Sequence, residues 1–198
     1  MAFANMAELG PLTAQDKPPQ EAMLLFLTND ARAPKIKLAY TGVAVVPVCN
    51  GDTDSVLRGY LKGEIKLGKV KQYKPLTSPL DIRNPSDQFI IIILDDKVNW
   101  QFAANCAPFM IEKEAARDYV DARRVFADRK RRELVEVRGS TVQEGCRIGI
   151  FNAYGSRRSK KGSSVPFNLY VELLCGKAGK IPLVIDPGIG HPGGSGPG

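Results

Sequence analysis

The sequence predicts a mainly β protein, an antiparallel two-sheet sandwich, and three observations support this class. Segments in which apolar and polar residues alternate recur from residue 22 to residue 186, and a period of two is typical of half-buried strands. The 19 Gly and 14 Pro residues lie mostly between these segments, where a β protein needs turns. One run, Phe89–Leu94, is apolar throughout, which indicates a strand buried on both faces.

The expected strands follow one another with turn residues between them. Near the N-terminus they are residues 22–27, 35–46 and 57–67, and in the third Leu57, Leu61, Ile65 and Leu67 share one face. After the run at 89–94, the Asp95-Asp96-Lys97 turn leads to residues 98–102, which we expect to pair with that run. Further strands are expected at residues 109–111, 134–137, 147–151, 167–174 and 181–185.

Residues 112–132 depart from this alternation. Glu112–Arg117 is rich in helix-forming residues. Ala116, Tyr119, Val120 and Ala127 then lie roughly at helical spacing. The sequence therefore predicts one helix between about residues 112 and 130.

The length of 198 residues fits a single domain. Residues 1–20 contain Pro11, Pro18 and Pro19 without periodicity, which predicts a flexible N-terminal arm. We expect residues 21–187 to form the sandwich domain. Residues 188–198 are mostly Gly and Pro, which predicts a disordered tail.

Motifs that carry enzymatic chemistry are missing from the sequence. The single histidine, His191, falls in the Gly/Pro tail, where nothing would hold a catalytic base. No nucleophile elbow or phosphate-binding loop occurs. Asp95 and Asp96 are expected in a turn rather than as a converging acid–base pair. The sequence thus favours a protein that is not an enzyme and predicts no cofactor.

Metal binding and disulfides also find little support. Asp52 and Asp54 faintly resemble a calcium loop, but the bidentate Glu that such a loop requires is missing. Cys49, Cys106, Cys146 and Cys175 lie about 30 to 60 residues apart and form no Cys-x-x-Cys pair. The N-terminus lacks the basic start of a secretory signal, and the longest apolar run is too short to span a bilayer. We expect free thiols, no membrane partner and a cytoplasmic protein.

Basic clusters are the positive signal, within a net charge of +7. Lys and Arg in solvated loops can neutralise phosphates without reading sequence, and Tyr60, Tyr73 and Tyr154 can stack on bases. A solvated charged surface, or a site for an anionic protein, are the alternative interpretations. One cluster is Arg129, Lys130, Arg131 and Arg132; a second is Arg157, Arg158, Lys160 and Lys161; a third, on an expected strand face, is Lys62, Lys66, Lys69, Lys71 and Lys74.

Four short segments carry a family resemblance: Val98–Phe102, Pro108–Ile111, Phe167–Val171 and Ile185–Pro187. Over about residues 88–193 the chain resembles small uncharacterised bacterial β-sandwich proteins of the DP-EP type, whose relatives are loosely labelled nucleotide synthetases. The chain has the Asp186-Pro187 pair but no Glu-Pro pair. The resemblance implies a sandwich in a bacterial cytoplasm and no established activity.

Two functional hypotheses remain open from the sequence. The leading one is a non-catalytic binding or protein-interaction module, whose strand edges make pairing with a partner or with itself physically easy. The alternative is a basic, phosphate-directed nucleic-acid-binding protein.

Overall fold

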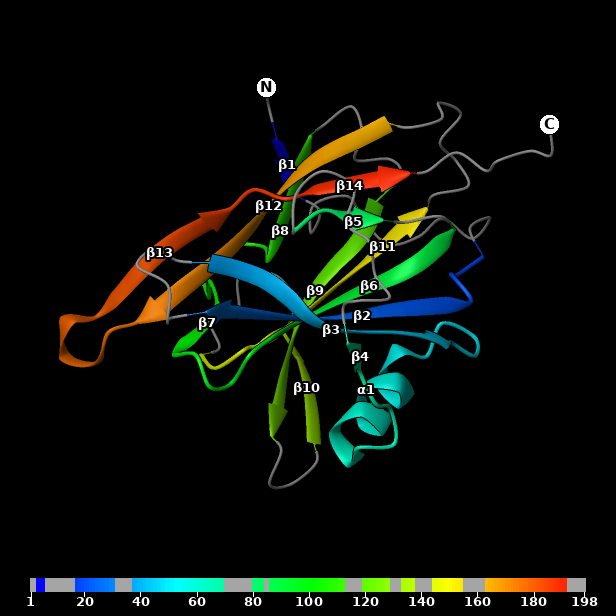
Figure 1. Ribbon diagram of the computed structural model, residues 1–198, viewed down its shortest axis with the longest axis horizontal. Helices are drawn as coiled ribbons and strands as arrows, with labels where there is room; N and C mark the ends of the chain where they lie inside the picture. The colour runs from blue at the N-terminus through cyan, green and yellow to red at the C-terminus, as the bar shows by residue number, and fades with distance from the viewer. Residues whose placement is uncertain are drawn as a thin grey trace.

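The computed structural model describes residues 3–5, 17–30, 37–69, 80–83, 86–112, 119–128, 133–137, 144–154 and 163–191. Within these residues the protein forms two seven-stranded sheets and one α-helix (Figure 1). The predicted mainly β, two-sheet fold is confirmed.

We call the first sheet sheet I. Its strand order is β1-β8-β12-β14-β5, and β7 and β13 also pair with β12. The members of sheet I are β1 (Phe3–Asn5), β5 (Ile82–Arg83), β7 (Trp100–Phe102), β8 (Phe109–Glu112), β12 (Ser163–Leu174), β13 (Lys180–Ile185) and β14 (Gly188–His191). A short 3₁₀ turn, Gly176–Ala178, connects β12 to β13, so the predicted hairpin at this place is confirmed.

The second sheet, sheet II, has the order β10-β9-β11-β6-β2-β3-β4. Its members are β2 (Glu21–Asp30), β3 (Lys37–Pro47), β4 (Gly68–Lys69), β6 (Asp87–Leu94), β9 (Tyr119–Asp128), β10 (Glu133–Val137) and β11 (Ile148–Tyr154).

Both sheets are mainly antiparallel, as the sequence predicts, and each contains one parallel pair. β2 pairs with β6 in parallel, and β14 pairs with β5 in parallel. Parallel neighbours need a crossover connection. Between β2 and β6 the chain forms β3, α1, β4 and β5, which carry it back to the end of the sheet where β2 begins.

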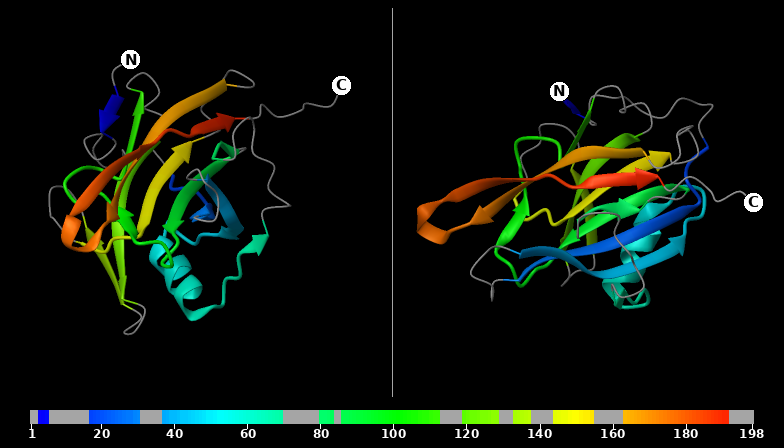
Figure 2. Two further views of the ribbon diagram at one scale, coloured as in Figure 1. Left: turned by 60° about the vertical axis from the view of Figure 1, so that its left-hand side comes forward. Right: turned by 45° about the horizontal axis from the view of Figure 1, so that its top comes forward.

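The main core lies between the inner faces of the two sheets (Figure 2). Met23, Ile90 and Ile92 of sheet II pack there with side chains of sheet I such as Trp100 and Phe167. The alternate residues of β6, which are Phe89, Ile91 and Ile93, belong to a second apolar cluster on the outer face of sheet II. β6 is therefore buried on both faces, as its unbroken apolar run predicts.

The helix α1 (Thr53–Lys62) covers the outer face of sheet II, and Val56 and Leu57 bury themselves in the second cluster. The strand predicted over residues 57–67 was wrong. The Asp52 carboxylate caps the N-terminus by accepting from Ser55 N at 3.0 Å, and Gly63 ends the helix with φ of 78°. Both caps are typical helix-terminus residues.

The helix predicted between 112 and 130 was also wrong. Residues 119–128 are the strand β9, which pairs with β10 on one side and β11 on the other. Tyr119, Val120 and Val125 are residue types that favour strands. Pairing on both edges therefore decides the structure of residues 119–128, and residues 113–118 lie outside the described part of the chain.

Two further segments differ from the sequence-based expectation. Trp100–Phe102 does not pair with β6 across the turn; it crosses to sheet I and pairs with β12. Gly188–His191 pairs with Ser163–Pro166 as β14, whereas the tail was expected to begin at residue 188. Residues 192–198 lie outside the described part of the chain.

Candidate functional site

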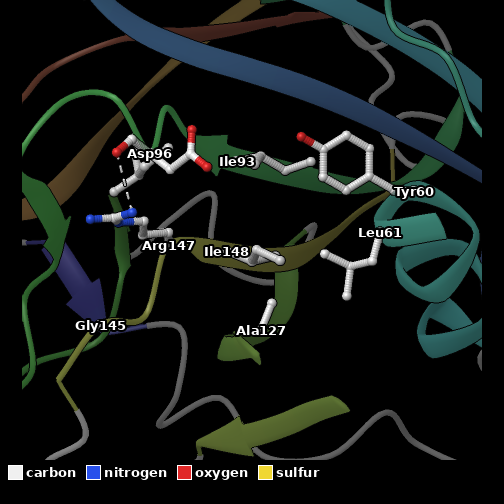
Figure 3. A pocket seen from close by; sticks show the side chains of 9 residues that line it. Tyr60, Leu61, Ile93, Asp96, Ala127, Gly145, Arg147 and Ile148 are labelled. Carbon is white, nitrogen blue, oxygen red and sulfur yellow. Dashed lines mark hydrogen bonds between the residues drawn. The ribbon is translucent and has the colours of Figure 1, made fainter. Parts of the chain in front are cut away.

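A pocket of about 300 Å³ lies between α1 and the outer face of sheet II (Figure 3). Its volume is at the small end of ligand pockets, which measure ~300–1,000 Å³. The residues that line it come from α1, from three strands of sheet II and from two loops: Tyr60, Leu61, Ile93, Leu94, Asp96, Ala127, Gly145, Arg147 and Ile148.

The floor and one wall of this pocket are apolar. Ile93 and Ile148 face each other from neighbouring strands, since β6 and β11 pair with Ile148 opposite Ile93. Tyr60 and Leu61 form the wall at the C-terminal end of α1, away from the charged residues (Figure 3). The register of α1 places Val56 and Leu57 in the cluster below and leaves the next turn to line the cavity.

The opposite end of the pocket is charged. Arg147 Nε donates to the Trp100 carbonyl oxygen at 3.2 Å, and its Nη1 donates to the Asp96 carbonyl oxygen at 3.5 Å. Both are long for hydrogen bonds of this type, whose usual length is ~2.9–3.0 Å. A guanidinium has five N–H donors, so Arg147 keeps donors that these carbonyls do not use. Asp96 lines the same end and is exposed.

A rigid turn holds the two charged residues in place. The buried Asp95 carboxylate accepts from Thr28 Oγ1 at 2.7 Å and from Lys97 N at 2.9 Å. Trp100 Nε1 donates to the Asp95 carbonyl oxygen at 2.8 Å. Arg147 is fixed to the same strand end, because its carbonyl oxygen accepts from Leu94 N at 2.8 Å.

A second polar network supports the loop at Gly145. The buried Gln101 accepts from Gly145 N at 2.7 Å and donates to Glu172 Oε2 at 2.9 Å. Lys180 bonds Glu144 and lies 3.8 Å from Glu172. The hydrogen bond to Glu144 raises the pKa of the Lys180 ammonium above its ordinary value. This network joins the loop beside the pocket to β7, β12 and β13.

The eight residues predicted to bind nucleic acid all lie outside the part of the chain that the structure describes. They are Arg129, Lys130, Arg131, Arg132, Arg157, Arg158, Lys160 and Lys161. In the third basic cluster, Lys62 ends α1 and Lys69 lies in β4, so the two do not share a strand face. Lys71 and Lys74 are outside the described ranges.

Other residues weighed from the sequence have structural positions. The predicted turn at Asp95–Lys97 is confirmed. Asp52 is the helix cap rather than a calcium ligand. The four cysteines form no disulfide. Asp186 is exposed after β13.

The sequence interpretation named Tyr60 but missed Arg147 as a site residue. Arg147 stands alone between Cys146 and Ile148, without a motif, and its role depends on a turn about 50 residues earlier. A signal for Tyr60 was available, because the Asp52 and Gly63 caps delimit a helix that carries it.

Comparisons with known protein families and with curated proteins found no match. No protein-family model matches the sequence, and no curated protein matches it at a significant level. The resemblance over residues 88–193 therefore stays a prediction. Within the described residues, no helix is both long and apolar enough to cross a membrane.

Proposed function

We propose that this protein is a non-catalytic binding module and that its binding site is the pocket between α1 and sheet II. The observation that carries the proposal is the position of Arg147. Its guanidinium lies at the end of an apolar pocket and bonds two main-chain carbonyls at 3.2 and 3.5 Å.

The composition of the pocket defines the kind of ligand. Ligand sites combine apolar walls with a few placed polar groups that fix orientation. Here the walls are aliphatic and phenolic, and the polar groups are a guanidinium and a carboxylate. The ligand we expect is one small ring or chain that has faces able to pack on apolar side chains and an acceptor group for Arg147. The pocket's side chains bind and orient, and they include no nucleophile beside a base.

The proposal can be tested with a substitution that fills the pocket with a larger side chain and removes no existing hydrogen bond. Ala127 and Ala44 are both half-buried alanines packed against the same outer-face cluster, but only Ala127 lines this pocket. Ala44 lines a separate groove of about 640 Å³ beside β3. A Leu side chain at position 127 is expected to abolish binding, and the matched Ala44→Leu variant to retain it.

The measurement is calorimetry with small carboxylates, aromatic amides and nucleosides against the unmodified protein and both variants. Binding that disappears with Ala127→Leu and survives Ala44→Leu supports this pocket as the site. Loss in Ala44→Leu instead would move the site to the β3 groove. Binding that neither variant changes would refute the proposal.

A second candidate function, nucleic-acid binding, is favoured by one observation. Ala127 lines the pocket, Asp128 pairs with Glu133, and the basic residues 129–132 follow directly in the chain. A protein that neutralises phosphates releases counterions, so its affinity falls steeply with salt. The test is fluorescence anisotropy with single- and double-stranded nucleic acid at about 50 and 200 mM salt. A flat salt response would exclude it, and unchanged binding in the double variant Arg157→Glu and Arg158→Glu would exclude the second basic cluster as its site.

The cytoplasmic location expected from the sequence belongs to this proposal as well. A binding module with two exposed cysteines, Cys49 and Cys175, suits a reducing compartment. Alkylation of the native protein after cell fractionation tests it, because reduced thiols in the cytoplasmic fraction would react.

A further inference from the structure

We infer that the pocket between α1 and sheet II recognises a guanine base. This inference rests on the proposed function and names its ligand class. It starts from the pair of groups at the charged end, because Arg147 supplies donors and Asp96 supplies a carboxylate acceptor within the same pocket. A ligand that satisfies both must present acceptors and donors side by side.

Guanine has this arrangement on adjacent edges of one ring system. Its O6 and N7 are acceptors, and Arg to O6 and N7 is the commonest specific contact to a base. Its N1–H and N2–H₂ groups are donors that suit a carboxylate. A carboxylate has about four lone-pair positions, so Asp96 can accept from the base in addition to its other interactions. Adenine presents an unprotonated ring nitrogen where guanine has N1–H, and it would face the carboxylate with an acceptor.

The rest of the pocket suits a flat heteroaromatic ring. Ile93 and Ile148 form the floor, and Tyr60 lies opposite the charged end (Figure 3). Stacking of bases on aromatic side chains is worth ~1–3 kcal/mol per base and tolerates any base. The apolar residues therefore bind the ring, and the charged residues select among rings. The volume of about 300 Å³ fits one ring system.

Hydrogen bonds hold the backbone of the turn that carries Asp96. Asp96 follows Asp95, whose carboxylate accepts from Thr28 Oγ1 and Lys97 N, and its own carbonyl oxygen accepts from Arg147 Nη1. The donor and the acceptor are thus spaced by main-chain contacts and not by flexible side chains alone. Preorganised polar groups of this kind lose little freedom on binding.

The experiment is isothermal titration of the full chain with GMP, AMP and XMP as probes. We expect GMP to bind about tenfold or more tightly than AMP, which is the discrimination of one well-made base contact. Arg147→Gln should weaken GMP binding about tenfold. Arg58→Gln, an exposed arginine of α1 that does not line the pocket, is its matched control.

A change of specificity distinguishes recognition from misfolding. Xanthine carries a carbonyl where guanine carries its N2 amine, so it needs a donor in place of the carboxylate. Asp96→Asn supplies that donor and should prefer XMP to GMP. Asp186→Asn, at another exposed aspartate away from the pocket, should keep the preference for GMP.

The outcomes distinguish a failure of guanine recognition from a failure of the proposed binding function. Equal binding of GMP and AMP, abolished by Ala127→Leu, would overturn guanine recognition and leave the binding module intact. No binding of any nucleotide would also overturn the inference, while the panel of other ligands still tests the pocket. A guanine-containing oligonucleotide that competes with GMP would identify nucleic acid as the source of the base, and one that does not would identify the free nucleotide; either result supports base recognition.

Discussion

The Thr28 hydroxyl donates to Asp95 Oδ2 at 2.7 Å and thereby ties the end of β2 to the turn that follows β6. Asp95 is 9% exposed, and its other carboxylate oxygen accepts from Lys97 N. Its backbone N–H donates to the Leu27 carbonyl oxygen at 2.9 Å. The carboxylate is therefore the anchor of the turn that presents Asp96 to the pocket.

Thr28→Val is expected to destabilise the protein. The substitution keeps the side-chain shape and removes one donor from a buried carboxylate, a loss of about 1–3 kcal/mol. Urea unfolding monitored by tryptophan fluorescence measures the free energy, since Trp100 is the chain's single tryptophan and is fully buried. Thr28→Ser keeps the hydroxyl and should retain most of the stability. Equal stability of all three proteins would show that the bond does not anchor the turn.

Gly149→Ala is expected to destabilise the core. A Cβ at this position would lie 2.7 Å from Phe109 Cζ and 2.9 Å from Phe102 Cζ, and both rings are fully buried. Overpacking of this kind costs about 1–3 kcal/mol. Denaturant midpoints of Gly149→Ala, Phe109→Leu and the double variant measure the coupling. If Phe109 is the obstacle, the double variant loses less stability than the two single losses combined.

Asp52→Ala is expected to lower stability by about 1 kcal/mol at pH 7 through the loss of a helix cap. Hydrogen bonds from the Ser55 hydroxyl and Ser55 N–H hold the pKa of Asp52 below its ordinary 3.8. A carboxyl group whose pKa is lower in the folded state stabilises the fold above its unfolded pKa, and this contribution disappears as pH falls through the folded pKa. The free energies of unfolding of the unmodified protein and of Asp52→Ala, measured between pH 7 and pH 2, should converge as the pH falls below 3.8. A difference in free energy that stays constant with pH contradicts the assignment.

Two regions show how much of the fold sequence patterns could predict. Period-two alternation predicted the half-buried strands and an unbroken apolar run predicted the buried β6, because a strand's own residues decide which of its faces are apolar. In residues 53–62 apolar residues at spacings of four fit a helix as well as a strand face, and the capping residues Asp52 and Gly63 decide between them. In β9 the deciding factor is pairing with β10 and β11, which no local pattern contains.

The pocket was less predictable than the fold. Tyr60 was singled out from the sequence, but Arg147 and Asp96 come together through a turn and a strand end that are distant in the chain. Neither belongs to a motif. Prediction of this site therefore required the register of β11 on β6, which places Ile148 opposite Ile93.

Pro182→Val is expected to promote self-association. Phe167 N bonds the Pro187 carbonyl oxygen, whereas Leu174 N bonds Asn99 on the opposite side of β12. Hydrogen-bonding directions alternate along β12, and its register with β13 is known. The backbone groups of Lys180, Pro182 and Val184 therefore point to the edge of β13 that no described strand covers. This hairpin extends beyond the sandwich in Figure 2, and Val184 is 54% exposed. A proline there removes a donor and blocks pairing.

Sedimentation velocity across a range of concentrations measures this prediction. The unmodified protein should keep a constant sedimentation coefficient, while Pro182→Val, with its restored N–H group, should show a concentration-dependent increase. Val184→Thr in the same background should reverse the increase by making the edge less apolar. Association of the unmodified protein that Pro182→Val leaves unchanged would assign the contact to another surface.

The parallel pairing of β2 with β6 sets the order in which this protein can fold during synthesis. β2 leaves the ribosome before its neighbour β6, which begins more than 50 residues later, and β11, on the other edge of β6, ends at Tyr154. The isoleucine-rich strand β6 is therefore synthesised before its partner β11. Such long-range pairing folds slowly, so we expect residues 87–94 to lack one of their two neighbouring strands until residues 148–154 have been translated.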